Sequence, residues 1–206
     1  MRRIGSAAAV ALALLGAAVR PAMAQSLSGV PLGVAPSGTG INLGVDYGSP
    51  DDTYGGGSAY GLTGGIGFSR FGVAASFGSL DPNNFNKTAA YGAMVGMRLI
   101  GGGLNPLAIG AQAGGAHAEV GAITTTTYNA GASVRFSPPL FPLKPWGLVY
   151  YAMSDNSSAK DEVRMSVGLD FNLLLGLGVH AAYDWGNDGG ATWGIGAHFK
   201  FGVPGM

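Results

Sequence analysis

The stretch Gly194-Ile-Gly-Ala-His-Phe-Lys-Phe201 alternates between bulky apolar residues and small or polar ones at every position. Successive side chains of a β-strand point to opposite faces, so this stretch predicts a strand with one apolar face. The same pattern returns along the chain from about residue 38 to residue 201. Gly recurs at every second or third position in these segments, which argues against helices, since each Gly costs a helix about 1 kcal/mol.

The composition indicates that these apolar faces do not all pack in the core of a soluble domain. Of 206 residues 38 are Gly, none is Cys and only 11% are charged. A soluble domain carries about 25% charged residues and covers its exterior with them. The aromatic residues are spread over the whole chain, which distinguishes it from a disordered Gly-rich linker. The composition therefore favours a membrane protein and offers no thiolate metal site.

The first 24 residues have the features of a secretory signal peptide. Arg2 and Arg3 precede an apolar run, and Ala22-Met-Ala24 fits the small-x-small rule for cleavage before Gln25. Cleavage there would remove three of the eleven basic residues and none of the eleven acidic ones. The resulting mildly acidic chain argues against a nucleic-acid partner.

The segments after Gln25 predict strands that cross a membrane, because none reaches the roughly 18 consecutive apolar residues of a spanning helix. Lipid cannot satisfy an open sheet edge, so the strands must close into a barrel. We count ten strands, with eight as the alternative if the first or the Ala-rich fifth is misassigned. The fold class is thus all-β, a transmembrane antiparallel up-and-down barrel. The predicted strands lie at about 38–47, 59–69, 71–79, 91–99, 107–116, 124–136, 146–150, 163–171, 177–185 and 191–201.

The predicted organisation has four parts: a signal peptide (1–24), an N-terminal periplasmic segment (25–37), the barrel (38–201) and a short tail (202–206). The Pro-containing segment 25–37 either hangs in the periplasm or tucks into the bore. Outer-membrane barrels have short periplasmic turns and longer outer loops. Connections after strands two, four and eight are short and those after one, three, five and seven longer, which places both termini in the periplasm.

The chain resembles the small single-chain outer-membrane β-barrel proteins of Gram-negative bacteria. The resemblance covers residues 1–201 and rests on the signal peptide, the alternating strands, a last strand ending in Phe201, and aromatics assigned to the membrane interfaces. It implies an outer-membrane location, contact with lipids including lipopolysaccharide, and recognition of the last strand by the barrel-assembly machinery. The assigned interfacial aromatics are Tyr47, Tyr60, Tyr150, Tyr183, Trp146, Trp185 and Trp193.

Charged residues on the lumen-facing phase form the first candidate site. Arg98, Arg135, Asp170 and Lys200 fall near the periplasmic ends of the even strands. At the same depth the odd strands present small residues, namely Gly72, Ala108, Gly147 and Gly176. Two interpretations remain open: an ion network that fills a narrow barrel, and a positively biased constriction that selects small solutes.

Two further polar pairs are predicted in the lumen. Arg164 and Asp184 should face each other across neighbouring strands as a stabilising pair. His180 and His198 share the inward phase, with Asp170 and Asp184 within plausible reach. We interpret the histidines as hydrogen-bonded lumen residues and predict no metal, cofactor or catalytic residue, although two His and a carboxylate also suit a metal or proton relay.

The function predicted from the sequence is a small outer-membrane barrel with a structural or passive small-solute permeation role, and not an enzyme. One alternative is an enzyme at the outer rim acting on lipid or peptide, which requires a nucleophile or carboxylate beside His117 or His180. Another is a soluble exported barrel that binds an apolar ligand, which would turn Phe and Leu inward.

Overall fold

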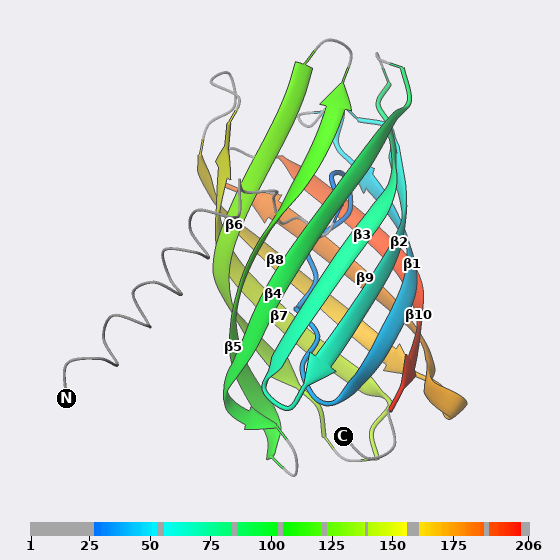
Figure 1. Cartoon of the computed structure of the whole chain (residues 1–206), viewed down its shortest axis with the longest axis vertical. Coiled ribbons are helices and arrows are strands. Elements are labelled where there is room, and N and C mark those ends of the chain that lie inside the picture. The colour runs from blue at the N-terminus through cyan, green and yellow to red at the C-terminus, as the bar shows by residue number, and fades with distance from the viewer. Residues whose placement is uncertain are drawn as a thin grey trace, which may run out of the picture.

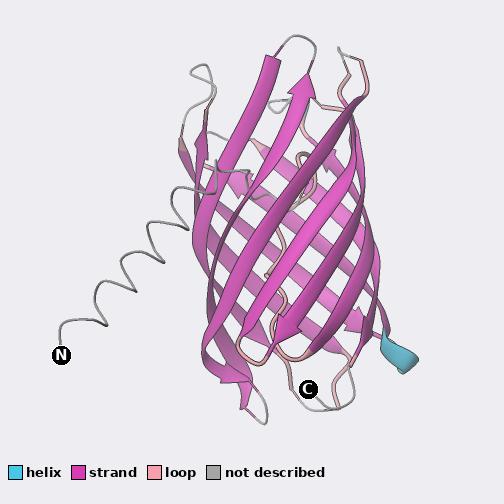
Figure 2. Cartoon of the chain, viewed as in Figure 1, coloured by secondary structure: helices cyan, strands magenta, loops and turns pink. Residues whose placement is uncertain are grey.

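A computed structural model describes residues 27–52, 56–83, 86–102, 105–120, 123–138, 140–155, 161–187 and 190–202. Within these residues ten antiparallel strands close into one barrel (Figures 1 and 2). The all-β, ten-stranded up-and-down fold is confirmed. The predicted signal peptide lies outside the described residues, as does the tail after Gly202. The strands are β1 (Gly40–Pro50), β2 (Ser58–Phe68), β3 (Phe71–Asp81), β4 (Thr88–Gly102), β5 (Asn105–Val120), β6 (Ile123–Phe136), β7 (Leu143–Ser154), β8 (Glu162–Asn172), β9 (Leu177–Gly186) and β10 (Ala191–Phe201).

Large apolar side chains cover the outside of the barrel, and small or polar ones line the lumen. In β3, Phe71 and Phe77 are about 60% exposed, whereas Ala74 and Ser76 between them are buried. Phe68, Val134 and Phe199 also face outward. The orientation predicted from the alternation is therefore confirmed. No helix among the described residues is long and apolar enough to cross a membrane.

Strand β7 departs from the predicted orientation. Trp146 and Tyr150 were assigned to the outer face as interfacial aromatics, but they are buried in the lumen with Leu148, while Val149 and Tyr151 are exposed. The segment is apolar on both phases, so alternation alone does not fix which phase faces the lumen. Pairing with β8 fixes it, because Leu148 and Tyr150 lie opposite lumen-facing Ser166 and Arg164. The assignments of Trp146 and Tyr150 as interfacial aromatics, and of Gly147 to the lumen, were therefore wrong.

The two ends of the barrel differ in their connections. At the end where β1 begins and β10 ends, which we call the terminal end, β2 and β3 are joined only by Ser69 and Arg70. The opposite end, the loop end, carries the longer connections 51–57, 82–87 and 155–161. The connection after β5 was predicted to be long but comprises only residues 121–122, since β5 runs to Val120. The connection 137–142 is a long exception at the terminal end.

Residues 27–38, which we call the plug segment, run through the inside of the barrel (Figure 1). Leu27 and Val30 pack near the loop end, in a cluster with Ala59, Leu80, Ala90 and Ala118. Farther along, Leu32 and Ala35 join a second buried cluster that contains Met94, Trp146, Leu148 and Tyr150. The Gly38 amide then donates to the Ser69 carbonyl, 3.0 Å away at the terminal end, before β1 begins. The sequence left two positions open for segment 25–37, the periplasm and the bore. The structure places residues 27–37 in the bore.

Candidate functional site: the plugged lumen and its basic pocket

The plug segment is held in mid-lumen by a hydrogen-bonded side chain of β5. The Ala35 amide donates to Oε1 of Gln112 at 2.9 Å, and Nε2 of Gln112 donates to the Gly33 carbonyl at 2.9 Å. Gln112 is 5% exposed. Two backbone groups of a segment outside the sheet ladder thereby find partners away from water, as buried polar groups require.

Inward glycines of the wall make room for the plug segment. A Cβ atom at Gly48 would overlap the Gly29 carbonyl oxygen, one at Gly72 the Pro36 carbonyl oxygen, and one at Gly96 the Ala35 side chain. These positions lie on β1, β3 and β4, which form one wall of the barrel together with β2, so the plug segment crosses that wall. From the sequence, these glycines indicate only a wider bore. In the structure, the plug segment occupies the additional space.

Replacing Gln112 with Leu should loosen the plug segment. The change removes both hydrogen bonds; it leaves the buried Ala35 amide without its acceptor, which costs about 1–3 kcal/mol, and the half-buried Gly33 carbonyl without its donor, which costs less. We expect faster amide hydrogen exchange at Ala35, measured by mass spectrometry on the detergent-solubilised barrel. Gln112→Glu retains the acceptor but not the donor and should give a smaller increase. Equal protection of Ala35 in all three proteins would contradict this role for Gln112.

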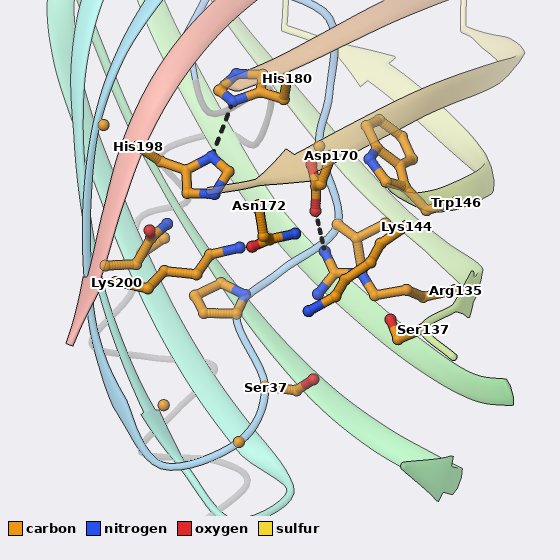
Figure 3. Close-up of a pocket in the computed structure, with 18 of the residues that line it drawn as sticks. Ser37, Arg135, Ser137, Lys144, Trp146, Asp170, Asn172, His180, His198 and Lys200 are labelled. Carbon is orange, nitrogen blue, oxygen red and sulfur yellow. Dashed lines mark hydrogen bonds and ion pairs between the residues drawn. The ribbon is translucent and has the colours of Figure 1, made fainter. Parts of the chain in front are cut away.

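The four charged residues predicted to form a lumen layer all border one pocket at the terminal end (Figure 3). Its volume is about 460 Å³, and Arg98, Arg135, Asp170 and Lys200 line it. Figure 3 labels the last three of these residues. Nη2 of Arg135 lies 3.7 Å from Oδ2 of Asp170, and Nη2 of Arg98 donates to the Ser69 carbonyl at 3.2 Å. The sequence predicted that small residues on the odd strands would separate these charged residues all around the ring. On β7 this prediction was wrong.

Lys144 also lines this pocket, and sequence reasoning missed it. It lies opposite Asp170 across the β7–β8 ladder, two residues from the inward-facing Trp146. The missed signal was the phase of β7: once Trp146 is placed inward, Lys144 must point inward too. Trp146 replaces the expected glycine and forms part of the pocket wall (Figure 3).

His180 and His198 are brought together deeper in the same pocket. Their rings stack with centroids 5.6 Å apart, and their Nδ1 atoms lie 3.3 Å apart. Nε2 of His180 lies 2.8 Å from Oδ1 of Asp46, and Oδ2 of Asp46 accepts a hydrogen bond from Oγ1 of Thr63 at 2.6 Å. Asp46 was missed because it becomes a neighbour only when β1 closes against β10. Among the described residues no group of three His, Asp or Glu is arranged to hold a metal ion.

Arg164 and Asp184 form an ion pair within a buried cluster nearer the loop end. Nη2 of Arg164 is 2.5 Å from Oδ1 of Asp184, and Nη1 is 2.5 Å from Oε1 of Glu162. The Tyr150 hydroxyl donates to Oδ2 of Asp184 at 2.6 Å. The predicted direct register was wrong, since Asp184 pairs with Ser166 and reaches Arg164 diagonally. All four side chains are at most 10% exposed, so the cluster fills part of the lumen beside the plug segment.

Comparisons with known proteins identify the fold and no closer relationship. No family model matches the chain, and no curated protein matches it. The β domain of the Bordetella autotransporter BrkA is similar in structure, with 13% identity and a TM-score of 0.52, covering 81% of this chain and 100% of that one. The N-terminal β-barrel domain of Pseudomonas aeruginosa OprF gives 12% identity and a TM-score of 0.42, with 79% and 98% covered. The chain therefore has the fold of outer-membrane β-barrels, as the sequence resemblance predicted.

Proposed function

We propose that this protein is an outer-membrane barrel with a structural role, closed to solutes by its own N-terminal segment. The single observation that carries the proposal is the position of the plug segment, whose Leu27, Val30, Leu32 and Ala35 are each at most 6% exposed inside the barrel. A barrel of about eight strands has an interior just wide enough for side chains. In this slightly larger barrel, the plug segment takes up the additional width.

Placement in the outer membrane is supported by the outer surface of the barrel. Apolar side chains project from all ten strands, and the Tyr47 ring packs 5.1 Å from Tyr60 and 5.5 Å from Trp193 near the loop end. Such an exterior suits acyl chains and argues against the soluble alternative, which needed Phe and Leu to face inward. As partners we propose membrane lipids, including lipopolysaccharide, and the assembly machinery acting on β10 with its terminal Phe201.

The passive-permeation alternative requires the plug segment to leave the lumen. The pocket at the terminal end would then continue into a bore with an excess of positive charge, which favours anions. Without that displacement, the two buried clusters that contain the plug residues Leu27, Val30, Leu32 and Ala35 occupy the path between the pocket and the loop end.

The rim-enzyme alternative has partial support in the geometry. Nδ1 of His117 lies 3.2 Å from Oγ1 of Thr126, as a base and a nucleophile would. The nearby carboxylate of Asp155 accepts from the Thr126 backbone amide at 2.6 Å, however, and not from the imidazole. In the described part of the chain, no hydrogen bond orients the second nitrogen of His117, so we assign no reaction to the pair.

Planar-bilayer recording tests the proposed function. The purified full chain, reconstituted at low density, should produce no steady current steps, because the plug segment blocks the lumen. Insertion is verified independently by protease resistance of the barrel in the same vesicles. Stable open-channel steps from the wild-type chain would contradict a closed structural barrel and favour the permeation role.

A further inference from the structure

The pocket at the terminal end contains cationic side chains whose charge is not balanced within it. Arg98, Arg135, Lys144 and Lys200 line it together with two carboxylates, Asp46 and Asp170. Four cations and two carboxylates leave an excess of two positive charges, before any charge on the histidines is counted. In Figure 3 the side chains of Lys200, Lys144 and Arg135 converge on the open space between β10, β8 and the plug segment.

Several donors around this space have no acceptor among the described residues. The ion pairs found among the described residues include neither the Lys144 nor the Lys200 ammonium. Nε of Arg98 and Nε of Arg135 are buried donors without a hydrogen-bond partner. A buried donor left unpaired costs about 1–3 kcal/mol, and more when it is charged. An anion in the pocket would satisfy donors that the protein itself leaves unused.

The two guanidinium groups of the pocket are held by neighbouring groups of the barrel. Arg98 is fixed by its hydrogen bond to the Ser69 carbonyl, and Arg135 by its ion pair with Asp170. All four cationic residues lie on strands of the closed sheet, and Pro36 and Ser37 of the plug segment form the facing wall. Guanidinium groups in fixed positions suit the oxygens of phosphate or carboxylate, and they lose little entropy on binding.

The size and lining of the pocket limit the ligand. About 460 Å³ accommodates a small organic molecule, and the mouth lies at the terminal end, beside Gly40, Asn172 and Gly202. The deeper wall is partly apolar, formed by Met94, Ala74 and the Trp146 ring. Such a wall would pack against a short carbon skeleton attached to the anionic group.

We propose that the barrel binds a small dianion of the phosphate class, inorganic phosphate or a short phosphate monoester, in this pocket between the four cations. Two negative charges match the excess of the lining, and a tetrahedral phosphate offers enough oxygens for two guanidinium and two ammonium donors. The site depends on the pocket of the closed barrel and not on whether the protein also conducts. On the proposed membrane orientation, its mouth faces the periplasm.

Isothermal titration calorimetry on the full folded chain in a zwitterionic detergent tests the proposal, with inorganic phosphate, glycerol phosphate and acetate as probes. Both phosphates should bind, acetate should bind at least about tenfold more weakly, and phosphate affinity should fall as salt is added. If glycerol phosphate binds more tightly than inorganic phosphate, the preferred ligand is the monoester. If the two bind equally, the ligand is the free phosphate ion. Acetate binding as tightly as phosphate would overturn the proposal.

Matched charge variants locate the site. Lys200→Gln should weaken phosphate binding by about tenfold, and a second change, Lys144→Gln, should weaken it further. Lys87→Gln is the control, because Lys87 lies at the loop end over the Tyr60 ring and away from the pocket. Folding of each variant is checked by its heat-dependent mobility on gels. Folded Lys200→Gln and double-variant proteins that keep wild-type affinity would overturn the assignment, as would an equal loss in Lys87→Gln.

Discussion

Deleting residues 27–38 is expected to turn a silent barrel into a conducting one. The plug segment contributes four nearly inaccessible apolar side chains to the lumen, and the wall beside them is lined by glycines that cannot close the space. Without the segment, water should connect the loop end with the basic pocket. We expect small current steps in planar bilayers with a preference for anions, because Arg98, Arg135, Lys144 and Lys200 would then line the bore.

A steric variant separates loss of the plug segment from loss of chain length. Gly96→Leu places a side chain where Ala35 lies and should displace the segment, giving conductance like that of the deletion. Gly64→Leu is the matched control, since a Cβ there meets only the Leu43 side chain at 3.8 Å on the outer face. If the deletion and Gly96→Leu proteins fold correctly but conduct no current, groups other than the plug segment seal the barrel.

Replacing Arg164 with Met should cause the largest loss of stability among single changes in the lumen. The guanidinium lies between the carboxylates of Asp184 and Glu162, and all three are buried. Removing one partner of a buried ion pair leaves uncompensated charge, which costs about 3–5 kcal/mol. Equilibrium unfolding in urea, followed by tryptophan fluorescence in detergent, measures the free-energy difference.

Two further variants show whether the loss comes from the ion pair. Glu119→Gln removes a charge at an exposed position near the loop end and should change the unfolding free energy by less than about 1 kcal/mol. In the double variant Arg164→Met, Asp184→Leu the loss should be smaller than the sum of the two single losses, because the residues interact directly. Additive losses would contradict a coupled pair.

The strands could be predicted because most of them carry one predominantly apolar phase. In β3 and β10 the apolar positions alternate with Gly, Ala, Ser, His or Lys, so both the strand and its lipid-facing side follow from the sequence. In β7 the run Leu148-Val-Tyr-Tyr151 is apolar on both phases, and the orientation depended on pairing with β8. The same ambiguity concealed Lys144 as a member of the basic pocket.

The contents of the lumen were less accessible to prediction, since they depend on contacts between distant segments. The plug segment has no alternation and contains Pro31 and Pro36, so no local pattern distinguishes a free tail from a buried one. Its place follows from the volume left by inward glycines on β1, β3 and β4, which exists only after closure. The contact between Asp46 and His180 likewise joins residues 134 positions apart.

Nuclear Overhauser contacts between the plug segment and the barrel wall test the central claim most directly. In uniformly labelled protein in detergent micelles, the Ala35 amide proton should show cross-peaks to the Gln112 side-chain amide, whose Oε1 accepts its hydrogen bond at 2.9 Å. Residues 27–38 should also have dispersed shifts and slow exchange. Narrow random-coil resonances for residues 27–38, with no cross-peak to Gln112, would contradict a barrel closed by its own N-terminal segment.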